Sequence, residues 1–266
     1  MQLILVQWNV AWETPSENFR AVNRLLDGTI VEPRALIVLP EMFSVGFTMN
    51  VAALAEDEGG ATEKYLGELA ARRGAFVLGG VMRRGTGGRG RNEAVVFDPD
   101  GNLLVRYAKL HPFSYAGETD HFEPGNEILV FDWDGLRAAP FVCYDLRFPE
   151  IYRHAVTLGA QMFVTIANFP SARVHHWTSL LVARAVENQA YSVGVNRCGS
   201  DPNGRYPGRS IVIDPRGRIL VEAGAAEDVI TVEIDPLSVV RYRDMFPALR
   251  DMRPDLLHAE LPHSGS

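Results

Sequence analysis

The chain has 266 residues, of which 47% are hydrophobic and 22% are charged, and its formal net charge is -7. This composition is typical of a globular protein with a large core, and the acidic balance argues against a broad surface for nucleic acid or anionic membranes. The two cysteines, Cys143 and Cys198, form no disulfide framework, so we expect a reducing compartment, the cytoplasm. No apolar run is long enough to cross a membrane, and MQLILVQWNV at the start lacks the features of a signal peptide.

Short apolar runs rich in β-forming residues alternate with helical patterns along the chain. This alternation predicts an α/β fold, and no linker divides the chain, so we expect one domain over 1–266. The polar tail after about residue 250 is expected to be loosely held. Strands are predicted at 2–8, 36–39, 76–82, 138–143, 161–167 and 191–195, and helices at 16–27 with Ser16 as N-cap, 62–73, 149–158 and 175–189.

Two segments of the chain have similar sequences. AVVFDPDGNLLV (94–105) and SIVIDPRGRILV (210–221) each place Asp-Pro-x-Gly between two apolar runs, which predicts a β-hairpin in both. Two β-rich halves of this kind favour two sheets packed face to face with helices outside. The basic, glycine-rich segment 83–92 is predicted to be a flexible loop, because no helix pattern follows it to make a phosphate site.

Three residues with reactive side chains follow apolar strands. Glu41 comes directly after ALIVLP, Lys109 ends LLVRYAK, and Cys143 ends AAPFVC. Ligands of α/β proteins bind at the carboxyl ends of strands, so this placement favours a functional role. Taken alone, each residue also has an ordinary interpretation: a solvated acid, a surface lysine and a buried inert thiol. Together they form a set that could meet at one sheet edge.

Cys143 poses the sharpest question, because it lies between a strand and a helix. In FVCYDLRFPE (141–150), Pro149 suits the first turn of a helix. A thiol close to a helix N-terminus feels the positive end of the helix dipole, so we expect the pKa of Cys143 to be lowered. The residue is then either a nucleophile on a sharp strand-to-helix turn or a structural thiol.

These motifs resemble those of the nitrilase, or carbon–nitrogen hydrolase, superfamily. The matches are LPEMF around Glu41, YAKLHPF around Lys109 and VCYDLRFPE around Cys143, in the superfamily's order and spacing. The resemblance extends from LVQWNVAW near the start to SIVIDPRGRIL near the end. It implies a four-layer αββα sandwich of two mixed sheets, a homodimer, and an enzyme that needs neither metal nor cofactor.

The superfamily also uses a second glutamate between the lysine and the cysteine. GETDHFEPG (117–125) offers Glu118 and Glu123. In the superfamily this acid lies several residues before the Pro-Gly, which favours Glu118 and leaves Glu123 as a turn residue. The resemblance implies that Cys143 attacks an amide carbonyl, that Glu41 is the general base, and that Lys109 stabilises the oxyanion. Glu118 would either hold Lys109 or position the substrate through a hydrogen bond.

Three further segments resemble the bacterial ω-amidase branch, whose members hydrolyse the side-chain amide of 2-oxo acids such as 2-oxoglutaramate. They are LPEMFSVGFTMN, HWTSLLVARAVENQAYSVGVNRCGSD and the ANFP at 167–170. The predicted partner is therefore a small amide that carries a carboxylate, which an arginine would bind. The candidate substrate-binding residues are Tyr144, Arg147 and Arg173, although Arg147 has an alternative role in tying down the turn through Asp145 or Glu150.

The sequence leaves other chemistries open. The same scaffold would serve an N-carbamoyl amino acid, an aliphatic amide or a nitrile, and a non-catalytic binding protein is a further alternative. The adjacent His175 and His176 lack metal-ligand spacing and are expected to point one inward and one outward. We expect His111 to be structural, although it follows Lys109 by two residues, and Cys198 to take no part in the chemistry.

Overall fold

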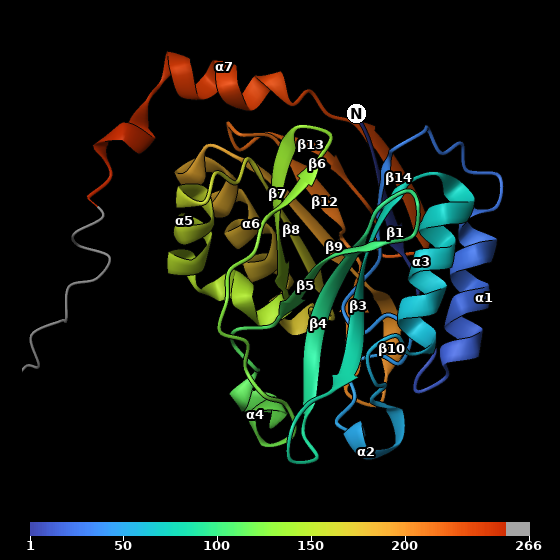
Figure 1. Cartoon of the computed structure of the whole chain (residues 1–266). Helices are drawn as coiled ribbons and strands as arrows, with labels where there is room; N and C mark the ends of the chain where they lie inside the picture. The colour runs from blue at the N-terminus through green and yellow to red at the C-terminus, as the bar shows by residue number, and fades with distance from the viewer. Residues whose placement is uncertain (254–266) are drawn as a thin grey trace, which may run out of the picture.

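Two six-stranded sheets form the centre of the molecule in a computed structural model that describes residues 1–253 (Figure 1). Both sheets contain parallel and antiparallel pairs. The first sheet has the order β14 (Asp228–Glu233), β1 (Gln2–Gln7), β2 (Leu36–Val38), β3 (Phe76–Arg84), β4 (Gly90–Phe97) and β5 (Leu103–Ala108). The second has the order β13 (Ile219–Glu222), β12 (Ile211–Ile213), β9 (Tyr191–Asn196), β8 (Met162–Ala167), β7 (Leu136–Val142) and β6 (Phe131–Trp133).

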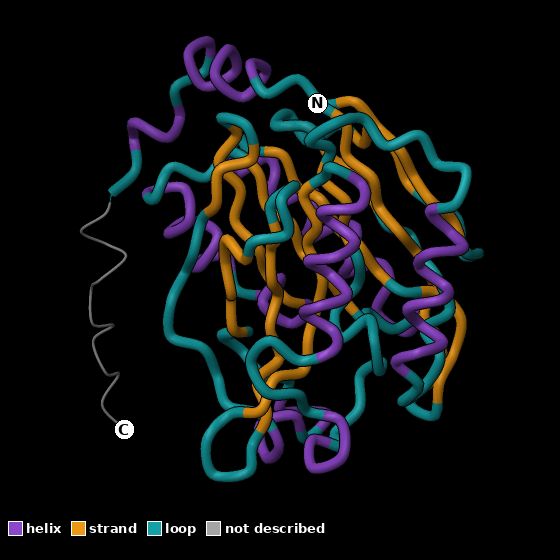
Figure 2. Tube along the Cα trace, turned by 45° about the vertical axis from the view of Figure 1, so that its right-hand side comes forward, coloured by secondary structure: helices purple, strands orange, loops and turns teal. Residues whose placement is uncertain are grey.

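Helices cover the outer face of each sheet (Figures 1 and 2). Alternate residues of a strand point to opposite faces, and β1 shows the result. Its residues Leu3 and Leu5 belong to the core between the sheets, whereas Ile4 and Val6 pack with residues of the helices outside the first sheet. Both faces of the strands are therefore buried, which explains their continuous apolarity. The covering helices are α1 (Pro15–Leu26) and α3 (Ala61–Arg73) on the first sheet, and α5 (Pro149–Thr157) and α6 (Val174–Asn188) on the second.

The predicted four-layer αββα sandwich is thus confirmed, together with its two echoed hairpins. β4 and β5 pair antiparallel around Gly101, and β12 and β13 do so around Gly217. These glycines have φ values of 84° and 83°, which a residue with a side chain adopts only at a cost. In both turns, the glycine N–H donates to the carbonyl of the aspartate three residues earlier at 2.9 Å. The same turn chemistry therefore shapes both halves.

Two local predictions are wrong. Ser16 does not cap the first helix, because α1 already begins at Pro15 and no side chain caps its N-terminus. A proline at this position supplies a helical φ and needs no hydrogen-bond partner for its nitrogen. The segment 83–92 is a loop only over 85–89, because β3 runs to Arg84 and β4 starts at Gly90, so half of its residues are in strands. Arg83 forms an ion pair with the buried Glu93, and this pair holds the Arg83 end of the segment in the sheet.

Several short elements lie outside the two sheets. The hairpin of β10 (Cys198–Asp201) and β11 (Gly204–Pro207) forms a small sheet of its own. The short helices are α2 (Val51–Leu54), α4 (Glu118–His121) and α7 (Leu237–Met245), and the single 3-10 turns are η1 (Ser114–Ala116), η2 (Cys143–Arg147), η3 (Ser171–Arg173) and η4 (Ala248–Asp251). The predicted loose tail falls, from residue 254 onward, outside the described residues. Within residues 1–253, no helix is both long and apolar enough to cross a membrane.

Candidate active site

Cys143 stands on a sharp turn between a strand and a helix. It follows the last residue of β7 and opens the 3-10 turn η2, which leads into α5. Its φ of 48° lies in the left-handed region, which is uncommon for a residue with a side chain and persists only where the surroundings impose it. The strand-to-helix turn that the sequence raised as a question is therefore present.

The carboxylate of Asp145 fixes this turn. It is fully buried, and one oxygen accepts hydrogen bonds from the Val142 N–H at 3.2 Å and the Tyr107 hydroxyl at 2.8 Å. The other oxygen accepts from the His111 N–H at 3.0 Å and lies 2.9 Å from His111 Nδ1. His111 also stacks on Phe148, with ring centroids 3.7 Å apart. His111 therefore supports the turn, as the structural role predicted for it requires.

Lys109 lies between two carboxylates in the interior. Its Nζ is 3.0 Å from Glu41 Oε1, and it is 3.1 Å and 2.8 Å from the two carboxylate oxygens of Glu118. The lysine side chain is 1% exposed and both glutamates are 0% exposed, so the structure brings three of the predicted residues into one buried cluster. Burial lowers the pKa of Lys109, but the charges of Glu118 and Glu41 outweigh it and raise that pKa above its usual value. Lys109 therefore stays protonated.

Glu41 is held at both oxygens and at its backbone. Burial alone would raise the pKa of Glu41, but the charge of Lys109 and the hydrogen bonds it accepts lower that pKa below its usual value. Asn92 Nδ2 donates to Oε1 at 2.7 Å, and the Asn168 N–H donates to Oε2 at 2.8 Å. Asn168 Nδ2 also donates to the Glu41 carbonyl at 2.8 Å. Glu41 is therefore an ionised, firmly oriented carboxylate.

Asn92 and Asn168 were missed by the sequence analysis. Asn168 lies within the ANFP segment, which drew attention only as part of a resemblance. Asn92 closes the segment that was predicted to be a flexible loop. An amide side chain carries no charge and no reactive atom, so neither residue gave a signal of its own.

A glycine lets β3 approach the Glu41 segment closely. A Cβ on Gly80 would lie 2.3 Å from the Met42 nitrogen and 2.6 Å from Glu41 Cα. Real Cβ atoms do not come this close to backbone, so only glycine fits here without moving the segment. Met42 itself has a φ of 43°, which shows how tightly the chain turns after Glu41. Direct backbone packing therefore sets the depth of the Glu41 carboxylate.

The expectation of a lowered thiol pKa at Cys143 is wrong. Burial, followed by the charge of Glu41, raises the pKa of Cys143 well above its usual value, and the opposing effect of Lys109 is smaller. The 3-10 segment η2 separates Cys143 from α5, which begins only at Pro149, so the thiol does not lie in the first turn of the α-helix. The resting sulfur is therefore a neutral thiol that needs a base to become a nucleophile.

This electrostatic arrangement leads to a prediction for the Glu41→Gln variant. Removing the carboxylate charge should lower the pKa of Cys143, since Glu41 raises it, and iodoacetamide should then alkylate Cys143 about three- to fourfold faster at neutral pH for each unit of pKa lost, because a less basic thiolate is also less nucleophilic. Amide turnover should fall in the same variant because the base is gone. Alkylation can be followed by mass spectrometry over a range of pH. Slower alkylation of the variant would contradict this assignment of charges.

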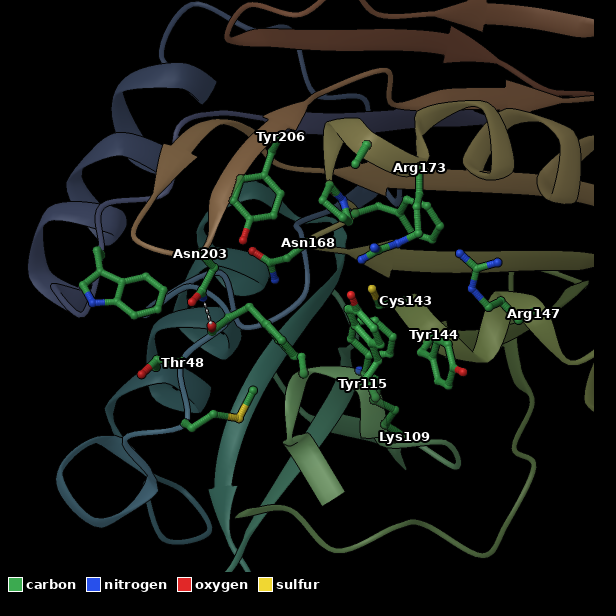
Figure 3. A pocket seen from close by; sticks show the side chains of 18 residues that line it. Thr48, Lys109, Tyr115, Cys143, Tyr144, Arg147, Asn168, Arg173, Asn203 and Tyr206 are labelled. Atoms are coloured by element: carbon green, nitrogen blue, oxygen red, sulfur yellow. Dashed lines mark hydrogen bonds between the residues drawn. The ribbon is translucent and has the colours of Figure 1, made fainter. Parts of the chain in front are cut away.

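A cavity of about 610 Å³ opens over Cys143 (Figure 3). Lys109 and Asn168 also line it, so part of the buried cluster faces the same space. All three candidate substrate-binding residues, Tyr144, Arg147 and Arg173, lie in its wall, and Figure 3 shows both arginines on the side where Cys143 lies. The remaining wall is largely aromatic or apolar: Trp12, Phe47, Met49, Phe113, Tyr115, Phe169 and Tyr206.

Neither arginine in this wall has a carboxylate partner within residues 1–253. Arg147 Nη2 lies 3.2 Å from His176 Nδ1, and its guanidinium lies over the rings of Tyr144 and Phe169. Arg173 lies over the Phe113 ring, 5.3 Å from its centroid. The alternative in which Arg147 pairs with Asp145 or Glu150 is therefore not what the structure contains. Two guanidinium groups are left available to an anion in the cavity.

The remaining candidates do not line the cavity. Glu123 forms an ion pair with Arg91 at 3.0 Å and so serves the turn, as predicted. His175 is exposed while His176 contacts Arg147, which matches the expected split between outward and inward rings. Cys198 is buried at the start of β10. In the described part of the chain, no three His, Cys, Asp or Glu residues are grouped to hold a metal ion, and the absence of a metal from the chemistry stays a prediction.

Comparison with known proteins agrees with this geometry. The omega-amidase YafV of Yersinia enterocolitica is 39% identical over 97% of this chain and 98% of its own length. The 2-oxoglutaramate amidase of Bacillus subtilis is 32% identical over 94% of this chain and 97% of its own. The solved structure of XC1258 from Xanthomonas campestris, described as a CN-hydrolase superfamily protein with an arsenic adduct in the active site, superimposes with a TM-score of 0.90 at 36% identity, covering 95% of this chain and 97% of that one. The carbon-nitrogen hydrolase family model matches residues 3–244, and the chain therefore belongs to the carbon-nitrogen hydrolase family.

Proposed function

We propose that this enzyme hydrolyses the side-chain amide of small 2-oxo acids of the 2-oxoglutaramate type and releases ammonia. The observation that carries the proposal is the placement of two arginines without carboxylate partners, Arg147 and Arg173, in the same cavity as Cys143. A substrate with an amide at one end and a carboxylate at the other fits this arrangement. The names of the relatives from Yersinia and Bacillus support the same substrate class.

In the proposed mechanism, Cys143 Sγ attacks the amide carbonyl while its proton passes to Glu41. The tetrahedral intermediate collapses when Glu41 returns the proton to the leaving nitrogen, which departs as ammonia and leaves a thioester. Water then attacks the thioester with Glu41 again as the base, and the acid and the free thiol are regenerated. The raised pKa of the thiol fits a sequence in which deprotonation accompanies attack.

Lys109 and Glu118 have electrostatic roles in this mechanism. The protonated Lys109 lines the cavity and stabilises the negative oxygen of each tetrahedral intermediate, together with a backbone N–H after Cys143. Glu118 holds Lys109 through both of its oxygens. Its own orientation is fixed because one oxygen also accepts a hydrogen bond from the Phe113 N–H. Tyr144, in the cavity wall, is proposed to contact substrate.

Ammonia release from 2-oxoglutaramate, glutamine, an N-carbamoyl amino acid and a simple nitrile tests the proposal. We expect turnover of 2-oxoglutaramate above the others, and an increase in its KM of about 10–100-fold in each of Arg147→Met and Arg173→Met, the loss of one charged hydrogen bond. A neutral amide such as propionamide should show little change in the same variants. If neither variant changes the preference for the anionic amide, the assigned role of the arginines fails.

The competing chemistries differ in the same measurement. Turnover of only the carbamoyl compound, the neutral amide or the nitrile would keep the thiol mechanism and change the substrate. No turnover of any compound would favour a non-catalytic binding protein.

We also propose that the enzyme is a cytoplasmic homodimer. Exposed apolar side chains gather on and next to α7, which supports an interface there: Leu237, Val240, Met245 and Phe246. Sedimentation at several concentrations tests the dimer.

The neutral, uncrosslinked thiol at Cys143 supports a reducing compartment, because an oxidised sulfur could not attack an amide.

A further inference from the structure

The side-chain amide of Asn92 bridges the two carboxylates of the buried cluster. Asn92 Nδ2 donates to Glu41 Oε1 at 2.7 Å and to Glu118 Oε1 at 2.9 Å. We infer that Asn92 is a positioning residue that offsets the crowding of two carboxylates around one lysine, and so keeps Glu41 a base at neutral pH. This inference rests on the role proposed for Glu41.

The charges of the cluster explain why such a residue is needed. Glu41 and Glu118 share one cation, Lys109, so the buried cluster carries an excess negative charge. The other titratable groups that face Glu41 are Cys143 and Tyr206, and neither supplies a positive charge. Like charges held close together in a dry interior drive one carboxylate to take up a proton unless donors compensate. The amide of Asn92 places two such donated hydrogen bonds between the carboxylates.

The orientation of the amide is fixed by its surroundings. Both carboxylate oxygens are acceptors, so only the NH₂ end of Asn92 can face them. Its Oδ1 is buried and has no hydrogen-bond partner within residues 1–253, and turning the amide over would place this oxygen against two negative charges. The Asn92 carbonyl accepts a hydrogen bond from the Lys109 N–H at 2.8 Å, so strand pairing fixes Asn92 beside the lysine. The site therefore accepts a neutral donor and excludes an acidic side chain.

The Asn92→Leu variant tests the inference, because leucine has a similar size and donates no hydrogen bond. We expect kcat/KM at neutral pH to fall about tenfold or more, and the acid limb of the pH profile to move up by about one unit or more, so that activity recovers at alkaline pH. Asn188→Leu is the matched control, since Asn188 is also fully buried with an unpartnered amide oxygen but lies on α6 and binds the Arg184 carbonyl. It should leave the acid limb where it is. An equal loss at every pH in Asn92→Leu would show a merely structural role and overturn the inference.

Infrared spectroscopy gives a second readout that needs no substrate. In Asn92→Leu, a buried carboxylic acid C=O band should titrate near neutral pH, whereas the wild-type protein should show none there. The band should disappear in the double variant Asn92→Leu with Glu41→Gln, because Glu118 is then the only carboxylate that pairs with Lys109. No titrating band in Asn92→Leu would refute the inference even if the substrate proposed above proves wrong. If Asn92→Leu shows the band but the wild-type protein does not turn over 2-oxoglutaramate, the inference is upheld and that substrate is rejected.

Discussion

Replacing Cys143 by alanine is expected to abolish amide hydrolysis and leave the protein folded. No other described side chain in the cavity carries a thiol, so the thioester cannot form, and turnover should fall by a factor of roughly 10⁴–10⁶. The loss of one partly buried sulfur changes stability by only about 1 kcal/mol. Ammonia release measures the first effect, and thermal unfolding measures the second.

Cys198→Ala is the control for this variant. Cys198 is the other cysteine of the chain, it is 2% exposed, and it does not line the cavity. Its replacement should leave kcat within about twofold of the wild-type value, because Cys198 does not line the cavity in which the reaction is proposed to take place. Residual turnover in Cys143→Ala that matches the Cys198→Ala rate would remove Cys143 from the mechanism.

Replacing Lys109 by methionine is expected to damage both stability and activity. The substitution keeps an unbranched side chain of similar length but leaves Glu41 and Glu118 buried without their cation. Breaking a buried ion pair in this way costs about 3–5 kcal/mol of unfolding free energy. Turnover should be lost as well, because the developing oxyanion would face two carboxylates without a positive charge.

The loss of stability in Lys109→Met should depend on pH with a definite sign. In the wild-type protein, the lowered pKa of Glu41 contributes stability that is present above the pKa of the unfolded chain and is lost as pH falls through the folded value. Without Lys109, the pKa of one buried carboxylate should rise instead, so the variant's deficit should shrink as pH falls and that group is neutralised. Denaturant unfolding at neutral and mildly acidic pH measures the deficit. A deficit that does not depend on pH would contradict this account.

Lys64→Met is the matched control, since Lys64 is the only other lysine of the chain and lies exposed on α3. Its loss should change the unfolding free energy by less than about 0.5 kcal/mol at either pH.

The fold and the reactive residues could be predicted because they leave strong local signals. Strands buried on both faces must be apolar throughout, and the Asp-Pro-x-Gly turns need glycine at a positive φ, as at Gly101. Glu41, Lys109 and Cys143 carry charge or a thiol and end strands, so they stand out from their neighbours.

What could not be predicted depends on distances that no local pattern contains. The raised pKa of Cys143 follows from burial and then from the charge of Glu41, a residue 102 positions earlier in the chain, and the local helix signal contains neither. The neutral amides of Asn92 and Asn168 acquire importance only where folding places them beside Glu41. The same holds for Arg147, whose local sequence offered carboxylates that it does not bind.

The pairing of β1 with β14 has a consequence for how the molecule is made. Gln2 lies opposite Glu233 in this antiparallel pair, so the first sheet is completed only by the last of its strands to be synthesised. While the ribosome is still translating the second half, β1 has one edge without a partner, and such an edge is open to pairing with other chains. Glu41, Lys109 and Glu118 lie in the half that emerges first, whereas Cys143 and Asn168 arrive with the second sheet. The nascent chain therefore holds its charged residues before it has the nucleophile, and its first sheet is complete only once β14, near the end of the chain, has paired with β1.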